Sequence, residues 1–91
     1  MLNDVEVINK LQKAFDESVI SQICSKTRKR FVFYCRVLAA ECCIRKGDSV
    51  TKVGKKLNRN HSTVSYYCKN FKNEYEYNAE FRNLADKVLK E

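Results

Sequence analysis

The sequence has no proline, a single histidine and only two glycines, Gly47 and Gly54. Because hairpin turns rely on glycine and proline, the scarcity of these two residues argues against a β fold and predicts an all-α chain. No apolar stretch is long enough to span a bilayer, and the N-terminus lacks the basic and apolar regions of a signal peptide. We therefore expect a soluble, cytoplasmic protein without a membrane partner.

Residues for catalysis or metal binding are also scarce. No CxxC pair accompanies His61, so a structural zinc site lacks its usual ligands. We expect the five cysteines to be buried thiols: Cys24, Cys35, Cys42, Cys43 and Cys68. Gly47 and Gly54 are seven positions apart and Lys55 is followed by Lys56, so the phosphate loop of an ATPase is absent. Without paired carboxylates or an evident nucleophile, we expect no enzyme, no cofactor, no metal and no small-molecule substrate.

Basic residues are concentrated in the middle of the chain. Residues 1–17 carry two Lys against four acids, residues 18–72 carry thirteen Lys/Arg against two acids, and residues 73–91 carry three Lys/Arg against five acids. The central segment therefore has a net charge of +11 between two segments of −2. Such a field attracts a polyanion, and nucleic acid is the favoured partner. The alternative is a solvated basic face without a ligand.

Hydrophobic periodicity predicts six helices in one domain of residues 1–91. The expected ranges are 4–16, 18–24, 29–46, 50–57, 60–76 and 78–89. We expect Ser18 to cap the second helix, Gly47 to end the third, and Asp48 or Ser49 to cap the fourth. Together these helices predict a compact all-α bundle whose acidic last helix closes the core.

The fourth and fifth predicted helices are joined by a tight turn at 58–59, and Asn60 is placed to cap the fifth. Val53, Leu57 and Val64 provide apolar contacts between these two helices, while small polar residues occupy the first turn of the fifth. This arrangement is typical of a DNA-binding helix-turn-helix.

Four segments extend this pattern over most of the chain: SKTRKR at 25–30, RVLAA at 36–40, VGKKL at 53–57 and RNHSTV at 59–64. In order and spacing they resemble the C-terminal DNA-binding domain of the bacterial replication initiator DnaA. The resemblance covers about residues 18–91, with one-residue shortenings after Gly47 and at Asn58. It implies a Trp-repressor-like helical fold, double-stranded DNA as the partner at A/T-rich asymmetric sites, and a nucleoid-associated role in replication initiation or transcription regulation.

The same resemblance implies which side chains contact DNA. Base contacts are expected from a loop arginine in the minor groove, Arg28, and from Arg36, Arg59, Asn60, His61, Ser62 and Thr63. Phosphate contacts are expected from Lys26, Lys29, Arg30, Ser49, Lys52, Lys55, Lys56 and Lys69.

Three positions depart from the family pattern. Val37 stands where the family has Gln, Asn60 where it has Asp, and Ser62 where it has Thr. Because a bidentate base contact gives about 1–3 kcal/mol of discrimination, these changes predict a shifted or less sharply defined target site. The initiator's ATPase is missing, so the chain alone cannot melt an origin.

A second class of function is a protein-interaction adapter that binds an initiator or regulator through exposed tyrosines: Tyr66, Tyr75 and Tyr77. Replacing Arg28 and Arg36 separates the two hypotheses, since only DNA binding requires these arginines. RNA binding is less favoured, because the chain has neither an aromatic RNA-binding sheet motif nor a GXXG loop.

Overall fold

The computed structural model describes residues 2–90, and over this range its regular secondary structure is helix alone, without a strand. Its helices are α1 (Val5–Leu11), α2 (Glu17–Ile20), α3 (Arg30–Arg45), α4 (Val50–Leu57), α5 (His61–Tyr77) and α6 (Ala79–Leu89). The predicted all-α class is confirmed. Between residues 2 and 90, no helix is both long and apolar enough to cross a membrane.

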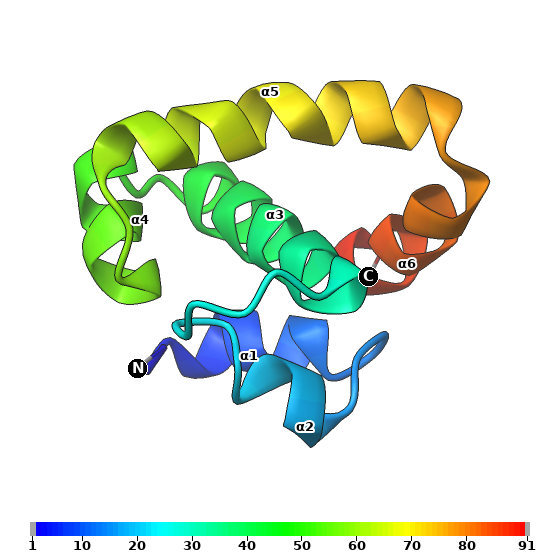
Figure 1. Ribbon diagram of the computed structural model, residues 1–91, viewed down its shortest axis with the longest axis horizontal. Coiled ribbons are helices and arrows are strands. Elements are labelled where there is room, and N and C mark those ends of the chain that lie inside the picture. The colour runs from blue at the N-terminus through cyan, green and yellow to red at the C-terminus, as the bar shows by residue number, and fades with distance from the viewer. Residues whose placement is uncertain (1, 91) are drawn as a thin grey trace.

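Helix α3 is the centre of the fold (Figure 1). Helix α5 lies across one side of it and α1 with α2 on the other, while α4 and α6 lie near its two ends. Every residue from Tyr34 to Ala40 is buried, because α3 is covered on all sides by the other five helices. The resulting body measures 29 × 27 × 25 Å.

The N-terminal part is less regular than predicted. Helix α1 ends at Leu11 rather than near residue 16, and the chain continues in turns that still bury Phe15. The expected cap at Ser18 is wrong. Asp16 caps α2 instead, accepting a hydrogen bond from the Val19 N–H at 3.2 Å and one from the Ser18 hydroxyl at 2.6 Å. The helix cap lies two residues earlier than expected, and the Asp16 carboxylate satisfies the free amide of Val19 in the first turn.

The boundaries of α3 and α4 follow the sequence signals closely. Gly47 adopts a φ of 104°, in the region that favours glycine, and the chain leaves α3 there. Of the two candidate caps for α4, Ser49 is the one observed, since its hydroxyl accepts from the Lys52 N–H at 3.1 Å.

The connection between α4 and α5 is short and tightly packed. Asn58 adopts a left-handed φ of 57°, and Asn60 caps α5 by accepting from the Thr63 N–H at 2.9 Å. Gly54 faces the turn so closely that a Cβ atom there would lie 2.5 Å from the carbonyl oxygen of Arg59. A glycine in α4 is therefore what lets the start of α5 approach this helix.

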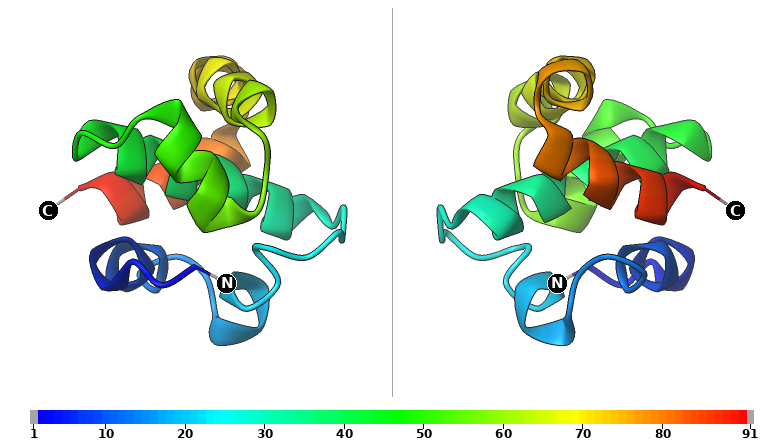
Figure 2. Two further views of the ribbon diagram at one scale, coloured as in Figure 1. Left: turned by 90° about the vertical axis from the view of Figure 1, so that its left-hand side faces the viewer. Right: turned by 90° about the vertical axis from the view of Figure 1, so that its right-hand side faces the viewer.

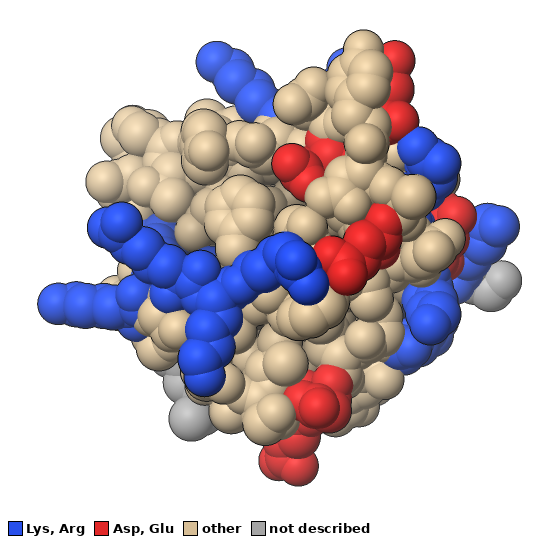
Figure 3. Space-filling model, turned by 45° about the vertical axis from the view of Figure 1, so that its right-hand side comes forward, with Lys and Arg blue, Asp and Glu red and all other residues tan. Residues whose placement is uncertain are grey.

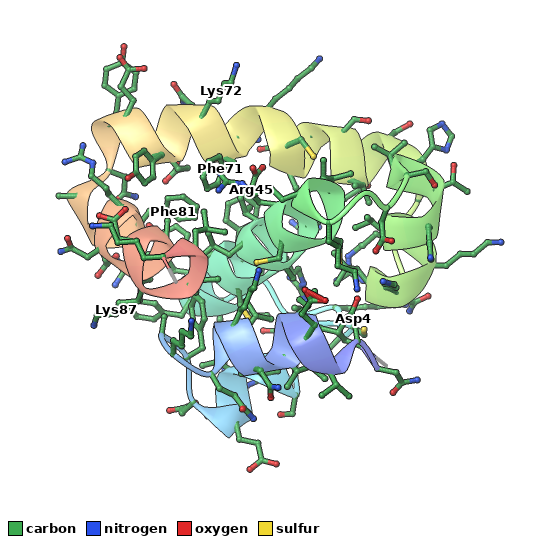
Figure 4. All side chains as sticks on the ribbon, turned by 180° about the vertical axis from the view of Figure 1, so that it is seen from behind. Asp4, Arg45, Phe71, Lys72, Phe81 and Lys87 are labelled. Carbon is green, nitrogen blue, oxygen red and sulfur yellow. The ribbon has the colours of Figure 1, made fainter. Side chains whose placement is uncertain are left out.

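The predicted role of the last helix in closing the core is confirmed. Phe81 of α6 packs edge-on against Tyr34 and Phe71, with ring centroids 5.3 and 5.9 Å apart (Figure 4). Asn78 caps α6 and also donates to the Tyr34 hydroxyl at 2.8 Å. On the other side of Phe71, the Arg45 guanidinium lies 5.7 Å from the ring centroid.

Three of the five cysteines are buried as expected, namely Cys35, Cys42 and Cys43. Burial raises the pKa of the Cys35 thiol to about 12 and those of Cys42 and Cys43 to about 11. They therefore stay protonated and serve as small apolar side chains. Cys24 and Cys68 are only partly buried.

Candidate nucleic-acid interface

The loop at 25–29, between α2 and α3, is built around the side chain of Arg36. The Arg36 guanidinium donates to four carbonyl oxygens: those of Ile23 at 2.8 Å, Thr27 at 2.8 Å, Ser25 at 2.6 Å and Gln22 at 3.3 Å. Arg36 is only 4% exposed. The expected base contact from Arg36 is therefore wrong for this structure, because the donors that would contact guanine are occupied inside the protein.

Val37, the neighbour of Arg36 on α3, is also fully buried, so it offers no methyl contact to a base. Burial lowers the pKa of Arg36, and the nearby positive charge of Arg59 lowers it further. The guanidinium nevertheless remains protonated, since arginine does not deprotonate in proteins. The loop thus encloses a permanent positive charge that carbonyl dipoles stabilise.

Arg59 joins this loop to the turn between α4 and α5. Its guanidinium donates to the carbonyl oxygen of Ser25, which Arg36 also binds, and to those of Asn58 at 2.9 Å and Leu57 at 3.4 Å. In Figure 2 the loop and the turn lie on the same side of the molecule. The sequence predicted Arg59 as a base contact and gave no sign of this bridge, because the acceptors are backbone atoms.

A cationic and aromatic hollow of about 630 Å³ separates the loop from α5, and we call it the loop hollow. It is lined by Lys26, Thr27, Arg28, Phe33, Arg36, Arg59, Tyr66 and Tyr67. Its lining contains four positive charges and no carboxylate.

A second hollow, of about 600 Å³, lies between α4 and the first turn of α5. Its lining includes Lys55, Asn60 and His61. Asn60, His61 and Ser62 are exposed, and Thr63 is half-buried. The side-chain oxygen of Asn60 accepts from both the amide and the hydroxyl of Thr63, so the NH₂ group is the part of this side chain that remains for a further contact.

Several of the basic side chains predicted to contact phosphate are exposed. Those without an ion pair over residues 2–90 are Lys26, Lys29, Lys55 and Lys69, and the same holds for Arg28, the arginine predicted to contact bases in the minor groove. Figure 3 shows a group of Lys and Arg side chains projecting together from one side of this face, while on its opposite side further Lys and Arg side chains are interspersed with acidic ones. Two other candidates have acidic neighbours: Lys52 lies 3.4 Å from Asp48, and Arg30 lies 3.3 Å from Glu80.

Lys56 is the second candidate that the structure removes. Its ammonium lies 2.7 Å from Asp4 and 2.6 Å from Asp48, and Lys46 lies 2.6 Å from the same Asp4 oxygen. We call these four residues the ion-pair cluster. The Asp4 and Asp48 side chains are 7% and 8% exposed, so the positive charge of Lys56 is neutralised within the fold. The expected phosphate contact from Lys56 is wrong, since the cluster holds its side chain.

The ion-pair cluster also fixes the start of the chain. Figure 4 shows Asp4 where the N-terminal segment approaches α4, and its carboxylate caps α1 by accepting from the Val7 N–H. Burial alone would raise the pKa of Asp4, but hydrogen bonds from Lys46 and Lys56, together with the Val7 amide, hold that pKa well below its ordinary value.

Asp4, Asp48 and the Cys43 thiol place their donor atoms within 4.8 Å of one another, which is close enough to consider a metal. However, the Lys56 ammonium already hydrogen-bonds both carboxylates, and burial raises the pKa of Cys43 to about 11. Because metal ligation needs a thiolate and free carboxylate oxygens, we assign this group to Lys56 and not to a metal.

The tyrosines named for a protein interface divide into two kinds. Tyr66 and Tyr77 are 55% and 77% exposed. Tyr75 is half-buried, and its hydroxyl donates to Asp86 at 2.6 Å. Only Tyr66 lines the loop hollow.

Comparison of the chain with protein-family models, with curated proteins and with solved structures gives no match. The assignment of a function therefore rests on the side chains described above.

Proposed function

We propose that this chain is a double-stranded DNA-binding module without enzymatic activity. In this proposal α4 and α5 act as a helix-turn-helix, and the first turn of α5 enters the major groove. Arg28, in the loop at 25–29, enters the adjacent minor groove. The resemblance to the DnaA C-terminal domain suggests a role in the control of replication initiation or in transcription.

The observation that carries the proposal is the bridge at the Ser25 carbonyl, where Arg36 and Arg59 meet. This bridge connects the loop that bears Arg28 to the turn that leads into α5. A protein that contacts neighbouring grooves needs its two inserting elements held at a fixed separation, because the groove spacing of a duplex is fixed. The bridge supports such a docking surface.

The distribution of charge gives further support. The loop side chains Lys26, Arg28 and Lys29 are exposed, and their positive charges are not neutralised by a carboxylate of residues 2–90. Such a surface releases counterions from DNA when it binds phosphates, which favours association at low salt.

Sequence preference in this proposal comes from few side chains. With Arg36 and Val37 buried, base contacts remain for Arg28 and for the exposed head of α5, which carries Asn60, His61 and Ser62. We therefore expect the preferred DNA sequence to span fewer base pairs than it would if side chains of both α3 and α5 contacted bases.

The test is selection of bound sequences from a random duplex pool, followed by anisotropy titrations of a selected duplex at several salt concentrations. If about five to eight phosphates are engaged, log K falls against log salt with a slope of about −5 to −7. Arg28→Ala should weaken binding by about fivefold or more, given a contact of about 1–3 kcal/mol. Lys87→Ala, at an exposed position on α6, is the matched control and should change little. A salt slope near zero rejects the proposal.

A second candidate function is a protein-interaction adapter, which the 77% exposure of Tyr77 favours. It makes the opposite prediction for two variants. Arg28→Ala should leave the partner bound, whereas Tyr77→Ala should release it. DNA binding that is unchanged by Tyr77→Ala and lost with Arg28→Ala rejects the adapter.

A further inference from the structure

The loop hollow has an imbalance of charge that the fold does not correct. Lys26, Arg28, Arg36 and Arg59 all line it, and none of these side chains forms an ion pair with the other residues that the structure describes. Arg36 is 96% buried beneath it, and its pKa is lowered by this burial and by the charge of Arg59. Carbonyl oxygens stabilise the charge of Arg36, but no carboxylate of the lining balances the four positive charges, so the hollow favours an anion.

Donor groups remain available to such an anion. A guanidinium has five N–H donors, and the hydrogen bonds of Arg59 to Leu57, Asn58 and Ser25 use three of them. Lys26 is exposed at the rim with its ammonium group not paired to any acid of residues 2–90. Guanidinium and ammonium donors together suit the tetrahedral oxygens of a phosphate group.

The hollow also has an apolar wall. Tyr66 is 55% exposed, and the rings of Phe33 and Tyr67 meet edge-on with centroids 5.9 Å apart. An inorganic anion does not use such a wall, but the deoxyribose that follows each phosphate in a DNA strand packs well against an aromatic ring. The lining therefore fits a sugar-phosphate unit better than a free ion.

The position of the loop hollow indicates which sugar-phosphate unit of the DNA it would bind. If the loop at 25–29 enters one groove and α5 enters the next, a single sugar-phosphate strand separates them, and the loop hollow lies between these two elements. Building on the proposed DNA binding, we propose that the loop hollow seats one phosphodiester of that strand, with Lys26 and Arg59 as its donors and Tyr66 against its sugar. Arg59 then contacts the backbone and not a base.

The experiment places a neutral methylphosphonate at each linkage of the selected duplex, one linkage at a time, and measures the affinity by anisotropy. For the unmodified protein we expect several sensitive linkages, since about five to eight phosphates are engaged. At one of them, the linkage in the loop hollow, neutralisation should weaken binding by about tenfold, the effect of losing charge-assisted hydrogen bonds. In Lys26→Ala and in Arg59→Ala this penalty should fall to about threefold or less at that same linkage, while Lys87→Ala keeps it.

Thermal unfolding of each variant shows whether it folds. If Arg59→Ala does not fold, Lys26→Ala alone tests the proposal, because Lys26 is an exposed loop residue whose replacement should leave the fold intact. Penalties that are the same in wild type, Lys26→Ala and Arg59→Ala at every linkage overturn the phosphodiester seat and leave DNA binding intact. Absence of salt-dependent binding to any duplex is a different result, which overturns the proposed function and the seat with it.

Discussion

Lys55 and Lys56 are neighbours in the sequence, yet they belong to two regions that differ in charge. In one region the basic side chains have no acidic partner among residues 2–90, and in the other carboxylates neutralise them. Lys55 is exposed and lines the hollow between α4 and α5, without an acidic partner in residues 2–90. Lys56 is the next residue of α4, so its side chain points in another direction and lies in the ion-pair cluster, where it contacts two carboxylates. The same contrast separates the loop hollow, which holds four positive charges and no acid, from the cluster, which is neutralised.

The difference shows that a count of basic residues overstates the charge offered to a ligand. Thirteen Lys/Arg lie between residues 18 and 72. Of these, Lys46 and Lys56 are ion-paired with Asp4, and the buried Arg36 binds carbonyl oxygens of the loop at 25–29. What remains for a polyanion is the set of side chains that the protein leaves without partners. Variants in the two regions should therefore separate stability from binding.

The largest expected effect is that of Arg36→Lys. Lysine keeps the charge but cannot reach four carbonyl oxygens, so about 3 kcal/mol of unfolding free energy should be lost as one buried and three partly buried hydrogen bonds are broken. Urea unfolding followed by circular dichroism gives this loss. We also expect weaker DNA binding, because the loop that presents Arg28 loses its support.

A double-mutant cycle distinguishes this positioning role from a general loss of stability. If Arg36 acts through the loop, the loss of affinity caused by Arg36→Lys should shrink when Arg28 is already alanine. Equal losses in both backgrounds, measured below the unfolding transition, would show that Arg36 does not act through Arg28.

The second prediction compares the adjacent lysines directly. Lys56→Ala leaves two nearly buried carboxylates with one partner fewer and should cost about 2 kcal/mol, less than a fully buried pair because Lys56 keeps some exposure. Lys55→Ala should change stability by less than about 0.5 kcal/mol. In DNA binding the order reverses: Lys55→Ala should make the salt slope shallower by about one, and Lys56→Ala should not change it. Equal slopes for the two variants would contradict the comparison.

Much of the fold could be predicted because its signals are local. Gly47, Ser49, Asn60 and Asn78 mark helix ends through their own backbone angle or side-chain cap. The sequence predicted Gly47 and Asn60 in these roles, offered Ser49 as one of two candidate caps, and placed the start of the last helix at residue 78. The first helix was predicted too long, because turns after Leu11 bury Phe15 as well as a continued helix would.

The candidate site was harder to predict because its contacts are distant or involve the backbone. One of the two partners of Lys56, Asp4, is 52 positions away. The sequence therefore did not show that Lys56 is ion-paired while its neighbour Lys55 is exposed. Arg36 binds carbonyl oxygens, which no residue type reveals. One signal was present: Arg36 interrupts an apolar run from Phe31 to Ala40, as a buried position on a central helix would.

The third prediction concerns acid stability. The pKa of Asp4 is lower in the folded protein than in the unfolded chain, so its contribution is present above the unfolded pKa of about 4 and is lost as pH falls below it. Asp4→Asn removes this contribution, which we expect to be about 1 kcal/mol at neutral pH. The difference in stability between the two proteins should therefore narrow from pH 5 to about pH 2. A difference that is constant with pH would show that the Asp4 charge does not stabilise the fold.

The smallest effect is expected at Arg30, which lies between the two extremes. It is 62% exposed and its guanidinium is 3.3 Å from Glu80, so it is neither buried in a cluster nor free of acids. Glu80→Gln removes the neutralising charge and should change stability by less than about 0.5 kcal/mol, as for most surface pairs. If Arg30 lies at the edge of the protein surface that contacts DNA, as the sequence predicted, the affinity for DNA should rise by about twofold at low salt and the gain should disappear at high salt.

The control for this prediction is Glu76→Gln, which removes an exposed acid of α5 and tests the effect of net charge alone. Asp86→Asn is not a suitable control, because Asp86 accepts a hydrogen bond from Tyr75. Equal gains for Glu80→Gln and Glu76→Gln would place Arg30 outside the interface.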